Sequence, residues 1–548
     1  MKKLFAWVLA LCIVCTTASL ACADELKLKY LDESLYPVAE GAELSVWCGQ
    51  NGNVADYEVN PENLALEQLT GVHINWITAP GTPADWNVMY NLHIASGNYA
   101  DIYMNGLSTA DIIEYANDVF IPLNDYIENT HWIKEYLEAM PEIREAITAP
   151  DGNIYSLWHY LPQTGDRNQD ANPYKLWVYK PWLDASGMDM PQTVDEFRDL
   201  LRYFRDHDMN GNGDLTDELP MFGSFAFDHD GSDPTYAIMQ AFQLTPSNFL
   251  WADEDYNVSC VAVTDGFREG LRYLNSMYEE GLISEDIYAL TLNEYRDVVN
   301  VTRQEDQVVG VAAAPYWMRF VTVSIFGERA YDEFTYLPVL KKDEDTPAQT
   351  YTRKSAIGLS GVVTTACEDP QLAIDWIDAC IDPEISCADF YGNEGEYWTR
   401  VSEDGALPIV QMAIPGKDLK DNGAQNAHCF GNSVFPCVPN AYIQTAYEAG
   451  SNAEKMDAIQ RAANADYMAA GVSDLMPAAA WCTDSDLLTE KAELQTDIEN
   501  AISTAYAEFI LGRKDVDDDA TWQAYKDELE SLGLSRYLEV VALVNFGA

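Results

Sequence analysis

Short apolar runs alternate with helix-like patterns over the first hundred residues of the chain. The run Glu43–Trp47 predicts a strand, and Asn60 with Pro61 predicts the start of a helix, because Asn caps helices and Pro suits the first helical position. That helix ends at Gly71. A strand at 72–77, a helix at about 84–95 and a strand at 102–104 follow. This alternation predicts an α/β fold with a mainly parallel sheet and helices on both faces.

A second α/β block begins near the apolar run 176–179. Its clearest helix is 193–204, in which Val194, Phe197, Leu201 and Phe204 share one face. Thr193 and Glu196 have the spacing of a capping box. A helix at about 267–280 and a strand at 308–313 continue the block.

The strand–helix pattern then returns, which predicts lobes built from discontinuous segments. We expect a strand at 356–364 and helices at 370–381, 487–511 and 522–532, with Trp182 and Trp376 in the core. Lobes that the chain crosses several times are joined by a hinge. The predicted division is 43–172 with 335–430 for lobe one, and 173–334 with 431–548 for lobe two.

The N-terminus has the pattern of an export signal, which we place at residues 1–23, followed by a polar tether at 24–42. Lys2 and Lys3 precede a short apolar stretch that is too short to span a bilayer. Two processing routes stay open. Ala21-Cys22-Ala23 fits cleavage before Asp24, and Cys22 also fits lipidation after cleavage at Ala21, although Ser19 replaces the usual Leu. Both routes place the body outside the cell membrane, secreted or lipid-anchored.

The charge of the chain narrows the classes of partner. Its 89 acidic residues outweigh 32 Lys and Arg, for a net charge of −57. A field of that sign repels phosphate backbones, anionic lipid surfaces and acidic polysaccharides. Strong acidity also keeps an abundant exported protein soluble, so the charge alone selects no substrate.

Eight cysteines lie beyond Cys22. An even number in an exported chain permits disulfides, and buried free thiols are the other interpretation. No C-x-x-C pair occurs and no Cys/His cluster has zinc spacing.

The loop 208–218 has the oxygen spacing of a calcium loop. Alternating side-chain oxygens in a Gly-rich turn are how an EF-hand-type loop wraps a hard cation. The twelfth position is Leu219 rather than Glu, so ordinary EF-hand closure fails, and Asp217 with Glu218 closes a shorter loop instead. The alternative is a solvated acidic turn. We predict a structural Ca²⁺ with ligands from Asp208, Asn210, Asn212, Asp214 (through its carbonyl), Asp217 and Glu218.

Aromatic residues recur at predicted strand ends and in loops. Ligands of open α/β sheets bind at the carboxyl ends of strands. Sugar rings have apolar faces and polar edges, so they suit stacking on aromatic rings with amide or guanidinium groups at the rim. The alternative for each ring is core packing. The candidate ligand contacts are Trp47, Asn105, Trp158, Tyr160, Trp251, Tyr316, Trp317 and Arg319.

The sequence contains few signatures of an enzyme. It has no Gly-rich phosphate loop, no G-x-S-x-G elbow and no H-E-x-x-H motif. A carboxylate pair for glycoside hydrolysis can be neither located nor ruled out among 89 acids. A secreted glycoside hydrolase is therefore one alternative function, and a surface glycan sensor or adhesin is another.

Several short segments, in order, resemble extracellular solute-binding proteins of family 1, in the lipoprotein-like branch that serves oligosaccharide ABC importers. Segments 94–102, 121–127, 148–155 and 177–187 resemble landmarks of its first half. Segments 193–197, 210–220, 281–283 and 392–399 are similar to its calcium-loop region and later landmarks. The loop 208–218 departs from the family by one extra residue, and the residues before Cys22 depart from its lipidation signal.

The resemblance implies a type II periplasmic-binding-protein fold, no catalysis and hinge closure on a ligand. The protein is then expected to be a monomer that captures an oligosaccharide in an interlobe cleft and delivers it to the permease subunits of an ABC importer. A lipid anchor at Cys22 is the one membrane contact expected, and the net charge of −57 disfavours nucleic acid as a partner.

Overall fold

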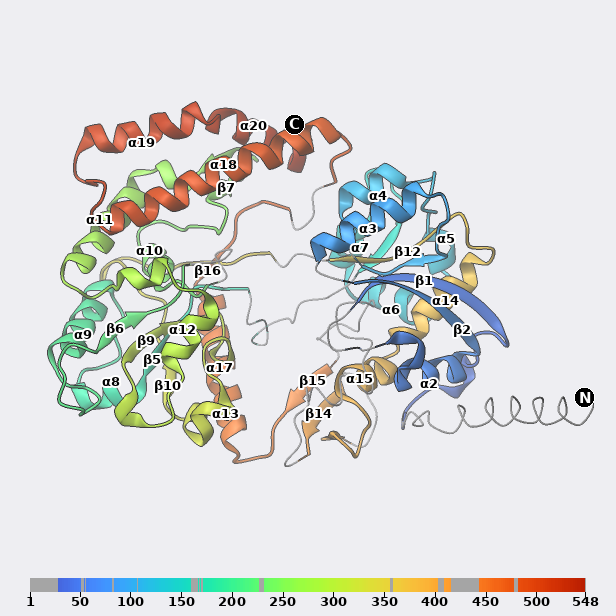
Figure 1. Ribbon diagram of the computed structural model, residues 1–548, viewed down its shortest axis with the longest axis horizontal. Helices are drawn as coiled ribbons and strands as arrows, with labels where there is room; N and C mark the ends of the chain where they lie inside the picture. The colour runs from blue at the N-terminus through green and yellow to red at the C-terminus, as the bar shows by residue number, and fades with distance from the viewer. Residues whose placement is uncertain are drawn as a thin grey trace, which may run out of the picture. The chain divides into compact units, whose positions relative to one another are not determined.

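The computed structural model describes residues 28–50, 54, 56–80, 83–105, 107–158, 166, 168, 171–225, 231–354, 358–402, 409–414, 443–477 and 481–547. The chain divides into two compact units. Unit 1 comprises residues 1–162 and 356–447, and unit 2 comprises residues 163–355 and 448–548. The α/β class predicted from the sequence is confirmed, with helices around several sheets (Figure 1).

Unit 1 is built on a five-stranded sheet with strand order β2-β1-β3-β12-β4. Its strands are β1 (Ala42–Gly49), β2 (Val72–Ala79), β3 (Ile102–Tyr103), β4 (Ser156–Trp158) and β12 (Leu359–Val363). A separate sheet holds β13 (Trp398–Arg400), β14 (Ile409–Ala413) and β15 (Ile443–Ala446). The helices of this unit are α2 (Pro61–Thr70), α3 (Pro83–Ala95), α4 (Thr109–Tyr115), α5 (Asn124–Ile127), α6 (Trp132–Ala139), α7 (Pro141–Ile147), α14 (Pro370–Cys380) and α15 (Pro383–Tyr391).

Unit 2 is built on a four-stranded sheet with order β10-β5-β9-β6. These strands are β5 (Leu176–Tyr179), β6 (Leu219–Phe222), β9 (Val309–Ala313) and β10 (Phe334–Tyr336). Two short pairs add β7 (Leu250–Ala252) with β8 (Val258–Cys260), and β11 (Thr350–Tyr351) with β16 (Gly471–Val472). The helices are α8 (Lys180–Ser186), α9 (Val194–Asp206), α10 (Pro234–Met239), α11 (Asp265–Glu279), α12 (Leu292–Val299), α13 (Val323–Phe326), α17 (Asn452–Ala469), α18 (Ser485–Ile510), α19 (Asp519–Ser531) and α20 (Leu534–Phe546).

Short 3-10 turns complete both units. Unit 1 contains η1 (Glu33–Leu35) and η2 (Tyr57–Val59). Unit 2 contains η4 (Val261–Val263), η5 (Glu285–Tyr288), η6 (Gln304–Asp306), η7 (Trp317–Arg319) and η8 (Gly327–Tyr331).

The helix-capping signals predicted from the sequence are present in the structure. Asn60 accepts hydrogen bonds from the backbone of Glu62 and Asn63 at the start of α2, and Gly71 ends that helix in the left-handed conformation. The capping box of Thr193 and Glu196 is present at α9. Trp182 and Trp376 are buried, as predicted.

The prediction of a mainly parallel sheet is wrong beyond the first strands. β1 runs parallel to β2 and β3, but β12 is antiparallel to β3 and β4. In unit 2, β9 is parallel to β6 and antiparallel to β5. The reason is the discontinuous chain, because β12 enters unit 1 after the chain has passed through unit 2.

The segment predicted as a tether is attached to unit 1 from residue 28 onward. The Tyr36 hydroxyl donates to Asp382, and the Gly41 N–H donates to the Gly71 carbonyl. The chain passes between the units near residues 162, 355 and 447, whereas the sequence placed these crossings at 172, 334 and 430. The stretch after 334 belongs to unit 2 because β10 pairs with β5.

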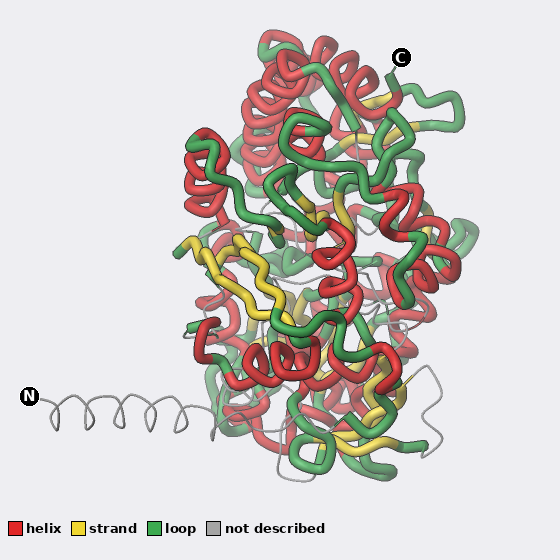
Figure 2. Tube along the Cα trace, turned by 90° about the vertical axis from the view of Figure 1, so that its right-hand side faces the viewer, coloured by secondary structure: helices red, strands yellow, loops and turns green. Residues whose placement is uncertain are grey.

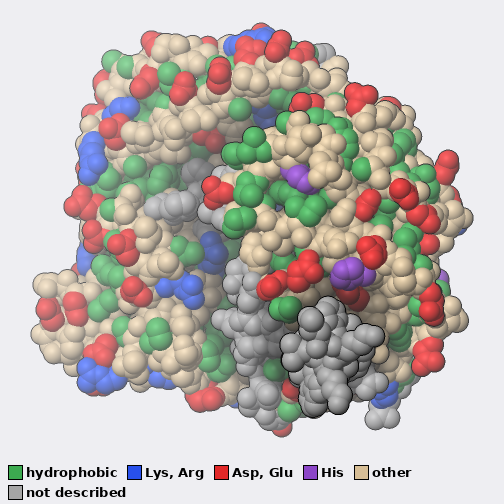
Figure 3. Space-filling model, turned by 45° about the vertical axis from the view of Figure 1, so that its right-hand side comes forward, with side chains coloured by type: hydrophobic (Ala, Val, Ile, Leu, Met, Phe, Trp, Pro, Cys, Tyr) green, Lys and Arg blue, Asp and Glu red, His purple; other side chains and the backbone are tan. Residues whose placement is uncertain are grey.

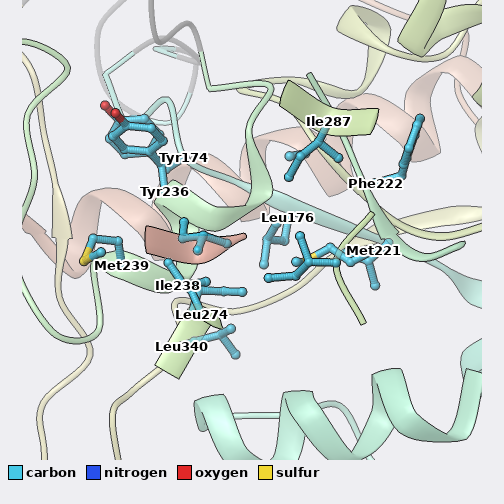
Figure 4. Close-up of a cluster of buried hydrophobic side chains, with 14 of the residues drawn as sticks. Tyr174, Leu176, Met221, Phe222, Tyr236, Ile238, Met239, Leu274, Ile287 and Leu340 are labelled. Atoms are coloured by element: carbon cyan, nitrogen blue, oxygen red, sulfur yellow. The ribbon is translucent and has the colours of Figure 1, made fainter. Parts of the chain in front are cut away.

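The core of unit 2 gathers side chains from its sheet and from helices far apart in the sequence. Tyr174, Leu176, Met221, Phe222 and Tyr236 lie together in Figure 4. The long helix α18 packs on α11 and on the last helix, α20, and the three helices lie together in Figure 1. Figure 2 shows helices gathered at the end of the molecule that holds the C-terminus. No helix of the described residues is long and apolar enough to cross a membrane.

Candidate functional site

The carboxyl end of β9 in unit 2 presents the first group of candidate residues. β9 ends at Ala313, and the chain turns through Tyr316 into η7. Tyr316 and Arg319 are half-buried, so parts of both side chains face solvent. Parallel β6 ends at the same edge of the sheet, which is where ligands of open α/β folds bind.

Trp317 holds this turn in place. Only 8% of its surface is exposed, and its ring meets Tyr331 edge-on at 5.7 Å between centroids. Its backbone N–H donates to the Gln460 side chain at 3.2 Å. Trp317 therefore acts mainly by positioning Tyr316 and Arg319, because little of its own ring is accessible to a ligand.

A second aromatic group lies on the hairpin of β7 and β8. Trp251 is half-buried and meets Tyr351 edge-on, with 6.3 Å between ring centroids. The Tyr351 backbone N–H donates to Gln240 at 3.1 Å, and burial raises the pKa of the Tyr351 hydroxyl. Sequence reasoning missed Tyr351, because it lies on a two-residue strand with no apolar run around it.

In unit 1 the candidate tryptophans are core residues. Trp47 is 2% exposed and packs on Tyr90 and Tyr103, while Trp158 is fully buried beside Tyr136. A ring covered on both faces cannot stack on a sugar unless the core opens, so the interpretation of these two as ligand platforms gives way to packing. Tyr160 lies outside the described residues.

Asn105 is also buried, 4% exposed, and its role is visible. Its side-chain oxygen accepts the backbone N–H of Gly49 at 2.8 Å. Asn105 follows β3, and Gly49 is the last residue of β1. The amide therefore ties two neighbouring strand ends together.

The predicted calcium loop follows α9 as a series of side-chain-to-backbone turns. Asp208 accepts the N–H groups of Gly211 and Gly213, both in the left-handed conformation. Asn210 accepts from Asn212 N–H at 3.0 Å, and Asn212 from Asp214 N–H at 2.7 Å. The oxygen-bearing side chains thus alternate along a tight loop, as a hard cation requires.

Two carboxylates close this loop with oxygens that lack a donor. Glu218 is 8% exposed and accepts Met209 N–H through Oε1. Its Oε2 and the Asp217 Oδ1 are buried without a hydrogen-bond partner among the described residues. Burial raises the pKa of the Glu218 carboxyl, and the charges of Asp217 and Asp208 raise it further. A cation would satisfy these oxygens, so the residues fit calcium.

The side chain of Asp214 is engaged otherwise, since it accepts from the backbone and hydroxyl of Thr216. No three His, Cys, Asp or Glu side chains converge into a ready metal site anywhere in the described part of the chain. The proposed ligand set depends on Asn oxygens and a carbonyl as well as on carboxylates.

Buried carboxylates with raised pKa serve as helix caps. Burial raises the pKa of Asp233 to about 7 and that of Asp382 to about 6. Asp233 caps α10 and Asp382 caps α15, and Asp378 accepts three backbone N–H groups at the start of α6. Each acid therefore has a structural task that explains its burial.

The described cysteines favour the interpretation of unpaired thiols. Cys48, Cys260, Cys367, Cys380 and Cys482 carry free thiols. Cys22, Cys429 and Cys437 lie outside the described residues. A surface hollow of about 450 Å³ beside β13, lined by Leu28, Lys29, Glu394, Gly395 and Thr399, is separate from the strand ends described above.

Comparison with known proteins gives relatives over most of the chain. No protein-family model matches. The chain is 26% identical over 489 residues to the fructooligosaccharide ABC transporter substrate-binding protein FusA of Streptococcus pneumoniae serotype 4. This alignment covers 87% of this chain and 84% of FusA. It is 24% identical over 242 residues to lipoprotein LipO of Bacillus subtilis, 44% of each chain.

Solved structures agree on the fold. An EF-hand mutant of FusA in complex with fructo-nystose has a TM-score of 0.67 at 24% identity and covers 91% of this chain and 98% of its own. An extracellular solute-binding protein from Bifidobacterium longum subsp. infantis has a TM-score of 0.73 at 18% identity and covers 91% and 97%. The predicted resemblance is confirmed: the chain has the fold of the solute-binding proteins and is a relative of the substrate-binding proteins of ABC transporters.

Proposed function

We propose that this protein is an extracytoplasmic solute-binding protein that captures a neutral oligosaccharide and delivers it to an ABC importer. The observation that carries the proposal is the 26% identity to FusA over 87% of the chain. A relative aligned over almost its whole length, with the same fold, supports a shared mode of action.

The exposed chemistry of unit 2 supports a sugar as the ligand. Trp251, Tyr351 and Tyr316 offer aromatic surface and Arg319 offers donors, which is the combination that a ring with apolar faces and hydroxyl edges requires. The net charge of −57 disfavours acidic glycans. We therefore propose these four residues as ligand contacts, with Trp317 in support.

Calcium has a structural role in this proposal. Asp208, Asn210, Asn212, Asp217 and Glu218 would hold the ion, with the Asp214 carbonyl. The loop follows α9 and precedes β6, so an ion there would fix the link between a core helix and a core strand. An EF-hand mutant of FusA supports the assignment.

Export and partners complete the proposal. The N-terminal signal sends the chain across the cell membrane, where it is either released or anchored through Cys22. The LipO relative is named a lipoprotein, which supports the anchored form. The protein acts as a monomer, and its partners are the permease subunits of the importer.

A thermal-shift screen of the mature protein tests the proposal. With calcium present, kestose, nystose, maltotriose and a neutral milk tetrasaccharide are each added in excess. A sugar at ~100 times its dissociation constant stabilises the folded state by about 2.7 kcal/mol, a shift of several degrees. Lack of any shift across the panel would remove neutral oligosaccharides from the proposal.

Two further measurements separate the alternatives. Release of reducing ends from the bound glycan by the purified protein would favour a glycoside hydrolase. Replacing Tyr316 by Ala is expected to weaken sugar binding, whereas Tyr256→Ala, an exposed tyrosine on the β7–β8 loop, is the matched control and should leave it unchanged.

A further inference from the structure

The carboxyl end of β1 in unit 1 carries an aromatic ring that the sequence analysis did not single out. β1 and β2 are parallel, and their last residues, Gly49 and Ala79, are register partners. α3 begins at Pro83, just after that edge, and places Trp86 in its first turn. The ring therefore stands at the edge of the sheet where open α/β folds bind ligands.

The indole of Trp86 lies flat on Gly49. A Cβ built on Gly49 would lie 2.3, 2.5 and 2.6 Å from three ring atoms, Cδ2, Cε2 and Cε3. Three such similar distances place the hydrogen of Gly49 under the face of the ring and not at its rim. Any side chain at position 49 would displace the indole.

The ring is held by packing and not by a hydrogen bond. Its Nε1 has no hydrogen-bond partner among the described residues. Gly49 is fixed in turn, since its N–H donates to the buried Asn105 side chain. Gly49, held by Asn105, therefore forms the floor under an indole that is itself only half-buried.

The surface that continues from Trp86 is apolar and open. Met89, one helical turn onward, is 38% exposed, and Val88 and Leu92 on the same helix are 61% and 67% exposed. Figure 3 shows hydrophobic side chains exposed among many acidic ones. Exposed apolar side chains beside an aromatic ring suit contact with another apolar surface.

We propose that Trp86, seated on Gly49 and continued by Met89, is the sugar-stacking platform of unit 1, with Gly49 and Asn105 as its positioning residues. The inference rests on the proposed function and names the unit 1 residues that recognise the ligand. An uncharged apolar platform takes the C–H face of a neutral sugar ring. A large aromatic side chain at the centre of a contact surface is the kind of residue that dominates the affinity of a site.

Isothermal titration of the mature protein, with the sugar of the panel that shifts its melting temperature, tests the platform. Trp86→Ala should weaken binding roughly thirtyfold, as truncation of an aromatic hot spot does, and Trp86→Phe should have a smaller effect. Gly49→Ala retains the indole and displaces it, so we expect about tenfold weaker binding. Trp132→Phe is the matched control, because Trp132 is also a half-buried tryptophan of unit 1 but its indole N–H donates to Asp382. The Trp132→Phe protein should bind the sugar with the affinity of wild type.

A spectroscopic readout keeps the test decisive if a variant folds poorly. In protein labelled with 5-fluorotryptophan, the ¹⁹F resonance that Trp86→Phe removes should move when the sugar is added. An unmoved Trp86 resonance, or an unchanged dissociation constant in folded Trp86→Ala, would overturn the platform while leaving the proposed function intact. If wild-type protein binds no sugar of the panel, the proposed function itself fails.

Discussion

The two units use aromatic side chains at strand ends in opposite ways. In unit 1, Trp47 and Trp158 lie within β1 and β4 and are buried, whereas in unit 2 Tyr316 lies three residues beyond β9 and stays partly exposed. Four consecutive residues of β1, 46–49, are buried, so both faces of the strand are covered by the rest of the unit. An aromatic residue inside such a strand becomes core, and only one past the strand end can meet a ligand.

The units also differ in how they bury charge. Unit 1 has a buried ion pair between Arg400 and Glu384, whose side chains are 4% and 7% exposed. In unit 2, Arg268 is similarly buried, but it donates to the carbonyls of Val516 and Asp517 and pairs with Asp519, which is 92% exposed. A carboxylate exposed to water stays solvated when its basic partner is removed. A buried carboxylate that loses its partner is left as an unpaired charge in the core, which costs stability.

The largest expected effect is therefore on unit 1. Arg400→Ala leaves Glu384 and Glu394 near each other without a cation, and we expect the unit to lose about 3–5 kcal/mol of unfolding free energy. Urea unfolding followed by circular dichroism measures this loss. Asp519→Asn, which removes the exposed partner in unit 2, should cost less than about 1 kcal/mol. Equal losses in both variants would erase the contrast between the units.

The second effect is a pH dependence set by one buried acid in each unit. Their folded pKa values, about 7 for Asp233 and about 6 for Asp382, lie above the unfolded value of 3.8, so each acid binds its proton more tightly in the folded state. Stability is then highest below about pH 4 as far as these groups are concerned, and falls as pH rises to their folded pKa. The ionised form of Asp233 costs on the order of 4 kcal/mol, and that of Asp382 somewhat less.

Thermal unfolding from pH 4 to pH 8 checks this sign. Asp233→Asn keeps an oxygen for the Thr235 N–H and hydroxyl and should remove the decline that extends to about pH 7. Asp382→Asn should remove the part that ends near pH 6. A variant whose stability still falls as steeply as that of wild type would show that its carboxyl is ionised throughout.

Much of the fold could be predicted from the sequence because local signals decide it. The Asn60 cap, the Gly71 stop and the capping box of α9 each fix an element boundary within a few residues. The apolar run of β5 coincides with the strand itself. The sheet directions could not be predicted, since they depend on which distant segment pairs with which strand.

The candidate site was predicted less well for the same reason. Tyr351 and Trp86 lie on elements whose sequences contain no ligand-like pattern, and both become candidates only through a neighbour far along the chain. Trp47 had the expected pattern, but the packing of Tyr90 and Tyr103 against it is invisible in the sequence. Periodicity locates strand ends, and tertiary packing decides which side chains there remain accessible.

The third prediction concerns calcium and should affect unit 2 alone. If the ion binds the folded loop, calcium at ~100 times its dissociation constant adds about 2.7 kcal/mol to the stability of unit 2. Thermal unfolding in calcium and in EGTA measures the difference. Glu218→Gln removes the charge of the buried carboxylate that closes the loop and should abolish most of this difference, while Asp199→Asn on the exposed face of α9 should not. If the melting temperature is the same in calcium and in EGTA, the loop is a solvated turn and not a calcium site.

The smallest effect compares the same substitution in both units. Gly310 lies within β9, and a Cβ there would lie 2.6 Å from Phe204, 2.9 Å from Trp182 and 2.9 Å from the Pro220 carbonyl. Gly310→Ala should therefore cost unit 2 about 1–3 kcal/mol of stability through overpacking. At Gly49 the three nearest atoms all belong to the half-buried ring of Trp86, which can move toward solvent, so the stability cost of Gly49→Ala should be smaller and its main cost should be in sugar binding. Urea unfolding and calorimetric titration of the two variants separate these losses. If Gly49→Ala unfolds as easily as Gly310→Ala and binds sugar normally, then Trp86 is core like Trp47, and the unit 1 strand end has no platform.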